Sequence, residues 1–442
     1  MLLVEYQKLT MKITRLILKN VRCYEHLDMS FLDFDKNEQE IGRARTIILG
    51  NNGTGKSTIL RSIALLLSGS SALGELIGNP DKWIKHGENS CNIKATFNAA
   101  NGEKRHIELM FKKGDELSQI IDRNRESLSQ LESSFEYTNR NYLTIGYGVH
   151  RRIGESHQLF RNENFRANNV SSLFLPNSAL YPFESWVLDL DYRRGSEGLM
   201  MIEKAINKLL PGITFYKIHK EKRAVLFKSE DGILSFDQLS DGYQISANWL
   251  GDLLFRITNI YEDRKDPFKA RFILLIDEIA LHLHPSWQRK IIDSISELFP
   301  NAQLIASTHS PFVAQQARDN ELFTVIKDEK SKNISLFHFE SDPRQLLIHQ
   351  ILMSDIFGLE TDESVLIQGQ KNSLRSKRKE KLAEFKKRLE VKDFTKSKSK
   401  QLSSAKVKGN LRIPLDNNEE ERIALLKKLT KELENLKNDS IN

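Results

Sequence analysis

The sequence has little cysteine, with Cys23 and Cys91 alone among 442 residues, and it contains no long apolar run. Two cysteines so far apart provide neither a disulfide framework nor the paired spacing of a zinc site, which fits a reducing compartment. A helix needs about 20 apolar residues to span a bilayer, and no segment approaches that length. Because the first residues mix charges through them and have no signal-peptide core, we expect a cytoplasmic protein without a membrane segment.

Charge is unevenly distributed along the chain. The net charge is +7, but residues 371–410 carry 15 Lys and Arg against 4 Asp and Glu, which leaves the remainder at about −4. This segment is poor in aromatic residues, so we interpret it as a solvated helix followed by a flexible linker. Either it has no ligand or it meets a polyanion such as DNA or RNA through non-specific charge. Apolar residues at helical spacing in 423–436 then predict a terminal helix.

The strongest motif lies in "TIILGNNGTGKSTILRSIALLLSG", where a short apolar strand meets Gly50-x-x-x-x-Gly55-Lys56-Ser57 and then a helix. This pattern predicts a P-loop. Glycines let successive backbone N–H groups face a phosphate, the lysine supplies charge to the β and γ phosphates, and the serine hydroxyl binds Mg²⁺. The residues predicted to bind ATP here are Asn51, Asn52, Gly53, Gly55, Lys56, Ser57 and Thr58.

A second apolar run, "RFILLIDE", ends in Asp277 and Glu278. Such a run predicts a buried parallel strand whose carboxyl end, where α/β sheets bind ligands, carries the acids. We expect Asp277, with Ser57, to hold Mg²⁺ and Glu278 to polarise the water that attacks the γ-phosphate. In isolation the same two acids are also typical of an ordinary strand end, but a P-loop in the same chain favours the catalytic interpretation.

A third strand, in "NAQLIASTHSPFV", delivers Thr308 and His309 to the same predicted edge. A single histidine is more often structural than catalytic. Its position one strand after the acids favours a catalytic role, with the imidazole reaching the γ-phosphate. The apolar periodicity of residues 285–299 predicts the crossover helix between these strands, and the order strand, helix, strand predicts a parallel sheet.

The stretch "LSDG", residues 239–242, is by itself a plain helix start, since Ser and Asp cap helices. In the order P-loop, "LSDG", "ILLIDE", "STH", however, the chain resembles the ATP-binding-cassette (ABC) ATPases, whose signature reads Leu-Ser-Gly-Gly. The resemblance implies that Ser240 and Gly242 close on the ATP held by a second subunit, and therefore a homodimer or higher homo-oligomer. Asp241 replaces the usual Gly, a change familiar in the RecF, SMC and OLD branch.

Other segments resemble the same branch. "ITRLILKNVRCYEHLDMSF" is similar to the first strand of RecF-like and SMC-like heads, which implies that Arg22 lies near the nucleotide phosphates. "DEIALHLHP" resembles their D-loop. No Gln stands where a Q-loop is expected, in "LTIGYGVHRR"; Tyr147, Arg151 and Arg152 either contribute there or are structural, and we expect the structural role.

We therefore expect an α/β fold: a P-loop NTPase head of ABC type with a mostly parallel sheet, an antiparallel β subdomain, an inserted helical lobe and a charged C-terminal tail. Alternation on either side of Asn101-Gly102 predicts a β hairpin, a polar linker follows near 113–140, and a second hairpin is expected within 214–232. The predicted domains are 1–115 and 237–345, the two parts of the head, with 116–236 as linker and lobe and 346–442 as the helical, basic C-terminal region.

The separation between motifs excludes some members of the RecF, SMC and OLD branch. Only 184 positions separate Lys56 from Ser240, which leaves no room for long coiled coils, and no Asp-x-Asp of a Toprim nuclease follows His309. Asp189 and Asp191 have that spacing, but we expect no metal site there. Residues 342–364 resemble stand-alone ATPases of bacterial anti-phage systems, with PtuA of Septu and retron-associated systems as the best fit. The resemblance implies an ATPase that controls an effector, an HNH-type or other nuclease. The alternatives are a RecF-like DNA repair clamp and, with less support, a transporter ATPase subunit.

Overall fold

The computed structural model divides into two units, residues 1–362 and 363–442. In the second unit the described residues 373–377, 379–381 and 383 are helical, and most of the predicted basic segment, like the whole predicted terminal helix, lies outside the described residues. The structure describes residues 12–34, 40–98, 104–137, 142–153, 164–328, 333–339, 342–354, 357, 368, 373–377, 379–381 and 383.

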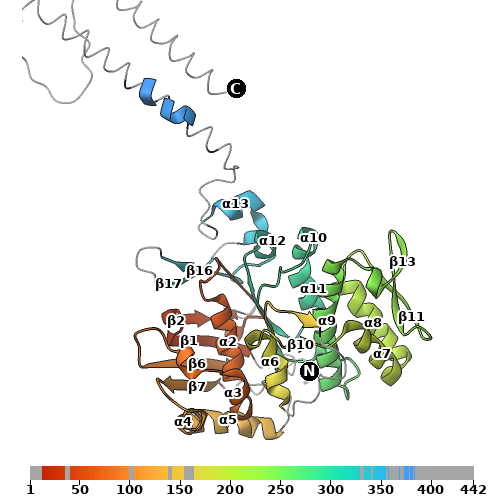
Figure 1. Cartoon of the computed structure of the whole chain (residues 1–442), viewed down its shortest axis with the longest axis horizontal. Helices are drawn as coiled ribbons and strands as arrows, with labels where there is room; N and C mark the ends of the chain where they lie inside the picture. Colours follow the sequence, from red (N-terminus) through yellow and green to blue (C-terminus); the bar gives the residue numbers. More distant parts are fainter. Residues whose placement is uncertain are drawn as a thin grey trace, which may run out of the picture. The chain divides into compact units, whose positions relative to one another are not determined.

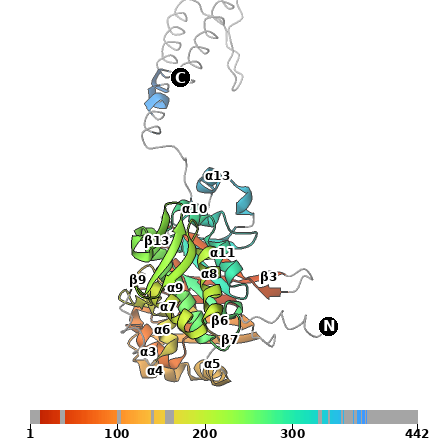
Figure 2. The same ribbon diagram turned by 90° about the vertical axis from the view of Figure 1, so that its right-hand side faces the viewer.

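A four-stranded antiparallel sheet has the order β2-β1-β6-β7. Its strands are β1 (Lys12–Val21), β2 (Tyr24–Ser30), β6 (Ser90–Asn98) and β7 (Lys104–Lys112). The predicted β6–β7 hairpin is confirmed, with Ile93 opposite Leu109 and Ala95 opposite Ile107. A small hairpin of β3 (Leu32–Phe34) and β4 (Glu40–Gly42) projects from the body in Figure 2.

The central sheet has six strands in the order β17-β16-β5-β15-β14-β8. All but β17 run parallel, and β17 pairs with β16 in the antiparallel direction. The mostly parallel α/β fold expected from the sequence is therefore confirmed. The strands are β5 (Arg45–Gly50), β8 (Thr144–Tyr147), β14 (Ile273–Ile276), β15 (Gln303–Thr308), β16 (Leu322–Lys327) and β17 (Ile334–His338).

The central sheet separates two hydrophobic cores. Alternate residues of β14 face opposite sides, because side chains in a strand have a period of two. Ile273 and Leu275 join the core with α2 (Lys56–Leu66) and the antiparallel sheet, whereas Leu274 and Ile276 join the core with α7 (Phe183–Arg194), α8 (Ser196–Leu209) and α9 (Asp241–Ile260). Each fully buried Leu or Ile contributes about 1.5–3 kcal/mol. In Figure 1 the red and orange elements and the green helices lie on opposite sides.

The predicted polar linker near 113–140 is wrong. That segment contains α4 (Leu117–Arg123) and α5 (Arg125–Tyr137). Glu116 and Gln119 form a capping box at the start of α4, and Ile120, Leu128 and Leu131 are buried in the core. These few apolar residues stand among many Ser, Glu and Arg, so the helical period is weak in the sequence although tertiary packing stabilises both helices.

The remaining elements connect these layers. The predicted hairpin within 214–232 is confirmed by β11 (Thr214–His219) and β12 (Ala224–Ser229), extended by β13 (Gly232–Ser235). The crossover between β14 and β15 is confirmed as α10 (Pro285–Gln288) and α11 (Ile291–Leu298). None of the described helices is long and apolar enough to cross a membrane. The other elements are α3 (Ser70–Leu76), α6 (Phe165–Phe174), α12 (Pro311–Ala314), α13 (Ile348–Met353), β9 (Arg152–Ile153), β10 (Ala179–Leu180) and four short 3₁₀ helices, Pro80–Trp83, Phe236–Gln238, Pro267–Lys269 and Pro343–Gln345.

Candidate nucleotide site

The predicted P-loop connects β5 to α2. Gly53 and Gly55 have φ angles of 77° and 98°, in the left-handed region that glycine adopts at low cost. A Cβ on Gly55 would lie 2.6 Å from Cys23 Sγ and 2.7 Å from the Tyr24 hydroxyl oxygen, so only glycine fits there. The close packing directs the chain into α2, whose free N–H groups and positive end make an anion site.

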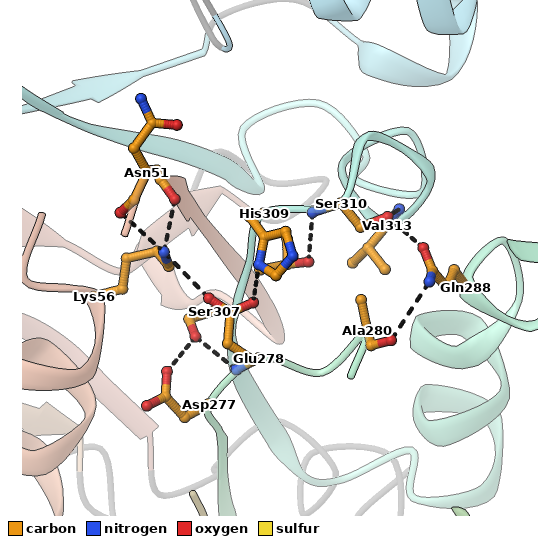
Figure 3. Close-up of polar contacts among 12 residues, drawn as sticks. Asn51, Lys56, Asp277, Glu278, Ala280, Gln288, Ser307, His309, Ser310 and Val313 are labelled. Carbon is orange, nitrogen blue, oxygen red and sulfur yellow. Dashed lines mark hydrogen bonds and ion pairs between the residues drawn. The ribbon is translucent and has the colours of Figure 1, made fainter. Parts of the chain in front are cut away.

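Lys56 joins the P-loop to the acids. It is 5% exposed, and its Nζ donates hydrogen bonds to the carbonyl oxygens of Gly50 (2.6 Å) and Asn51 (3.2 Å). The same Nζ lies 3.2 Å from Glu278 Oε1 (Figure 3). A buried ammonium is costly without partners, and here a carboxylate and two carbonyls compensate it.

The two acids follow β14, beside the end of β15. Asp277 is 2% exposed, and the Ser307 hydroxyl donates to its Oδ1 at 2.5 Å while accepting from the Glu278 backbone N–H at 2.9 Å (Figure 3). Glu278 has a φ of 49°, a conformation that costs a non-glycine residue roughly 1–2 kcal/mol. The surrounding contacts therefore hold this turn in a strained geometry.

His309 meets the free side of Glu278. Its Nδ1 lies 2.7 Å from Glu278 Oε2, so the glutamate carboxylate stands between an ammonium and an imidazole (Figure 3). Nδ1 must carry a hydrogen to donate to this carboxylate, which leaves Nε2 for another partner. The His309 side chain is 59% exposed, whereas the buried Thr308 hydroxyl accepts from the Ser310 N–H. Of these two residues, His309 is the one placed to meet a ligand.

A pocket of about 220 Å³ opens beside these groups. Larger hollows lie at the antiparallel sheet and α5, and between α6 and α9, but neither is lined by the P-loop or the acids. The geometry of polar groups therefore locates the site better than the size of the cavity does. The pocket is lined by Leu49, Gly50, Asn51, Asn52, His309 and Phe357.

The predicted Mg²⁺ ligands differ in exposure. Ser57 is the half-buried second residue of α2, and Asp277 is buried with one oxygen engaged by Ser307. In the described part of the chain, no group of three or more His, Cys, Asp or Glu could hold a metal by itself. A hydroxyl and a carboxylate are ligand types that Mg²⁺ accepts, so Ser57 and Asp277 would suit this ion if phosphate oxygens and water supplied its other ligands.

The signature residues lie at the start of α9. Ser240 is the N-cap residue and is exposed, with no capping hydrogen bond from its side chain. Asp241 is also exposed, and among the described residues a Cβ on Gly242 would meet only the His282 carbonyl oxygen, at 3.5 Å. The hydroxyl and the helix N-terminus are thus open to an approaching group.

Arg22 lies in the turn between β1 and β2. Cys23 and Tyr24 of this segment pack on the P-loop, and the Tyr24 hydroxyl donates to the Thr54 carbonyl at 3.3 Å. The Arg22 guanidinium lies over the Trp83 ring, 4.2 Å from its centroid. Burial and the neighbouring Arg61 lower the pKa of Arg22. The structure thus brings this turn to the P-loop and stacks the arginine on tryptophan.

Three positions carry contacts that the sequence motifs did not predict. The Gln288 amide donates to the carbonyl oxygens of Ala280 and Leu283 and accepts from the Ser310 hydroxyl, which ties the predicted D-loop to the segment after His309 (Figure 3). Ser307 joins the acids as described above. Arg151, expected to be structural, contacts the backbone of both acids.

Asp189 and Asp191 lie on α7, away from these motifs. Asp189 pairs with Arg193 one turn later. Residues two apart on a helix point in different directions, so these carboxylates do not converge on one ion.

The chain matches the family model described as "AAA domain, putative AbiEii toxin, Type IV TA system" over residues 45–314. It belongs to this family. The match runs from the strand before the P-loop to α12, just after His309. It includes every site residue described above except Phe357 and three residues at the β1–β2 turn, Arg22, Cys23 and Tyr24.

The relatives that the chain matches include bacterial proteins named after Septu and retron systems. The chain is 26% identical over 319 residues to Septu protein PtuA of Bacillus mycoides (strain KBAB4), covering 71% of this chain and 40% of that protein. It is 33% identical over 141 residues to the Retron Ec83 probable ATPase of Escherichia coli, and the matched region covers 32% of this chain and 26% of that protein. The chain thus spans less than half the length of these two relatives. A Septu protein PtuA of Bacillus thuringiensis is 25% identical, and the matched region covers 64% of this chain and 70% of that protein.

The solved structures that the chain matches include heads of SMC proteins. One is the Smc head domain with an extended coiled coil, bound to the C-terminal domain of ScpA, derived from Pyrococcus furiosus. It is 14% identical to this chain, and the match covers 75% of this chain and 96% of that one, with a TM-score of 0.41. The head from Thermotoga maritima is 15% identical, with coverages of 74% and 99% and a TM-score of 0.38. The family match and the curated relatives confirm the predicted resemblance to defence ATPases, and the relatives named ATPases support ATP hydrolysis.

Proposed function

We propose that this protein binds ATP with Mg²⁺, hydrolyses it between two copies of the chain, and thereby controls an effector, an HNH-type or other nuclease, in bacterial anti-phage defence. The observation that carries the proposal is the position of Glu278, which lies between Lys56 and His309 beside the P-loop. This is a carboxylate ready to polarise a water next to a phosphate-binding loop.

The roles of the other residues follow from their chemistry. Backbone N–H groups of residues 51–58 and the N-terminus of α2 bind the phosphates, and Lys56 adds a charge. Ser57 and Asp277 would hold Mg²⁺, which neutralises charge that develops on the phosphate oxygens. His309 holds the Glu278 carboxylate through Nδ1 and presents Nε2 to the γ-phosphate. We assign Arg22 to the outer phosphate environment, on its position in a turn packed against the loop.

Dimerisation is supported by the N-terminus of α9. Ser240 is exposed and its hydroxyl caps nothing in its own helix, so it can accept or donate to a group from outside the chain. A helix N-terminus attracts phosphate. We therefore propose that Ser240 and Gly242 contact the γ-phosphate bound to the P-loop of a second copy, as the resemblance to ABC ATPases implies.

The effector and the biological role rest on the relatives. Proteins named PtuA belong to Septu systems and the retron ATPases to retrons. We propose that ATP-bound subunits form dimers or larger rings that hold the effector, and that detection of a phage changes or releases this assembly.

Replacement of the proposed general base tests this function. Glu278→Gln keeps the size of the side chain but cannot accept a proton, so hydrolysis should fall by about 10²-fold or more while ATP binding remains. Phosphate release and equilibrium binding of ATP are the two measurements. Glu262→Gln, at a carboxylate that is 68% exposed on the surface, is the matched control. Hydrolysis by Glu278→Gln at the parental rate would refute the assignment.

A RecF-like clamp on DNA is the second candidate. Its support is the balance of 15 basic to 4 acidic residues in 371–410, which suits DNA binding under either function. Removing this segment should reduce the slope of log affinity for duplex DNA against log salt, because fewer phosphates are neutralised. An unchanged slope would place any DNA contact on another surface.

A further inference from the structure

Arg151 lies beneath the turn that carries the two acids. It is 9% exposed, and its Nη2 donates to the backbone carbonyl oxygens of Asp277 (3.1 Å) and Glu278 (3.0 Å). Its Nε also donates to the Gly148 carbonyl at 3.4 Å. A single nitrogen therefore joins two successive carbonyls at the point where the backbone of Glu278 turns into the left-handed region.

The other side of Arg151 rests on the signature helix. Its guanidinium lies 4.9 Å from the centroid of the Trp249 ring, a residue of α9. Four positions earlier, the Tyr147 hydroxyl donates to Asp252 of α9 at 2.6 Å, and the Tyr147 carbonyl accepts from the Asp277 N–H at 2.7 Å. The segment 147–151 is thus attached to α9 on one side and to the acids on the other.

Packing alone does not explain why a charged guanidinium, that of Arg151, is buried beneath this turn. Burial lowers the pKa of Arg151 to about 10, so the side chain is still a cation at neutral pH, and the nearby Asp277 and Glu278 offset part of the cost. Its Nη1 is buried and has no hydrogen-bond partner in the part of the chain that the structure describes. A buried guanidinium that leaves a donor unused costs more than an apolar side chain of the same size. An apolar side chain would lose the hydrogen bonds to the carbonyl oxygens of Asp277 and Glu278, so these two contacts are what the arginine adds.

We infer that Arg151 is a positioning residue for ATP hydrolysis, which holds the Glu278 turn so that the carboxylate lies between Lys56 and His309, and which joins that turn to the signature helix through Trp249. The inference rests on the proposed function. It concerns the backbone of the acids, so it leaves phosphate binding by the P-loop unaffected.

Arg43 offers a matched control. It is buried too, donates to the backbone carbonyls of Ser30 (3.2 Å) and Leu32 (2.6 Å), lies 5.0 Å from the centroid of the Phe323 ring, and leaves its Nε without a partner among the described residues. Arg43→Met therefore removes a similar set of interactions at a place that does not contact the acids.

The test compares kcat and the Kd for ATP in Arg151→Met, Arg151→Lys and Arg43→Met. A displacement of the reacting group by about 1 Å costs up to ~100-fold, so Arg151→Met should lower kcat by about 30- to 100-fold. Its Kd for ATP should change by less than about threefold, because Lys56 and the glycines are intact. Arg151→Lys keeps the charge but reaches one carbonyl less well, and its kcat should lie about fivefold below the parent. Arg43→Met should lose thermal stability and keep its kcat within about twofold.

Three results would overturn the inference. A folded Arg151→Met with the parental kcat would do so, as would an equal fall of kcat in Arg43→Met, which would mark a general effect of losing a buried arginine. If Arg151→Met does not fold, Arg151→Lys decides, and the parental kcat in that variant would be the contrary result. An inactive parent chain would refute the proposed function on which the inference rests, whereas an active parent with an equally active Arg151 variant overturns this inference alone.

Discussion

Glu278 shows how a single residue combines strain with function. Its positive φ is unfavourable, yet its N–H, its carbonyl and both carboxylate oxygens are engaged by Ser307, Arg151, Lys56 and His309. Strained residues persist only where the surroundings over-determine them, and they concentrate at functional sites. This geometry is the residue-scale basis for assigning the general base.

Gly55 allows a sharp prediction at the same scale. Gly55→Ala should abolish measurable ATP binding and reduce the free energy of unfolding by roughly 1–3 kcal/mol. An alanine is strained in the left-handed backbone conformation of this residue, and its Cβ would clash with Cys23 and Tyr24. Gly78→Ala is the matched control, because Gly78 has a φ of 62° but no atom of the described part of the chain lies within 4 Å of the added Cβ. Isothermal titration with ATP and thermal unfolding are the measurements. Equal behaviour of the two variants would show that the packing against Cys23 and Tyr24 is unimportant.

The motif residues could be predicted from sequence because their signals are local. Gly50, Gly55 and Lys56 lie within seven positions, and the acids end a continuous apolar strand. The partners of the acids could not be predicted in this way, since Ser307 is 30 positions from Asp277 and Arg151 is 126 positions from it. Such contacts depend on which strands become neighbours in the sheet.

At the scale of elements, the order of parallel strands assembles the site. β15 pairs with both β14 and β5, so the acids, His309 and the P-loop end at one edge of the sheet. Apolar runs and their turns predicted these strands and the crossover helices. The sequence did not predict helices α4 and α5, because their few buried apolar residues lie among long polar stretches. Whether such a segment is helical depends on its tertiary contacts.

The N-terminus of α9 yields a prediction about this element. Ser240→Arg places a long side chain on an exposed helix start, so the folded chain should still bind ATP but hydrolyse it at least tenfold more slowly, because a second copy can no longer close on the nucleotide. Steady-state phosphate release at several protein concentrations measures this. Ser196→Arg, at the exposed first residue of α8, adds the same single charge and is the control. Normal turnover of Ser240→Arg would count against a signature that acts on a partner.

For the molecule as a whole, stability should depend on pH through Lys12. Burial lowers the pKa of Lys12 to about 8, below its ordinary 10.5, while its Nζ donates to the Gly42 carbonyl. Between pH 8 and 10.5 the unfolded chain therefore holds a proton that the folded chain has released, so the free energy of unfolding rises with pH, by up to about 1.4 kcal/mol per unit. Below pH 8 both states are protonated and this dependence ends.

Denaturation midpoints of the parent and of Lys12→Met across that pH range check this dependence. Lys12→Met should lose it, whereas Lys19→Met, at an exposed lysine of the same strand, should keep it. Identical pH profiles in all three proteins would exclude Lys12 as the source.

The central claim is that ATP joins two copies of the chain, and the native mass of Glu278→Gln with Mg²⁺ and ATP tests it most directly. The variant should bind ATP without hydrolysing it, so its mass should be at least twice the 51.0 kDa of one chain, and adding Ser240→Arg should return it to a single chain. A second protein recovered with it from cells that express neighbouring genes would identify the effector. A mass of one chain with ATP bound at saturation would contradict the account.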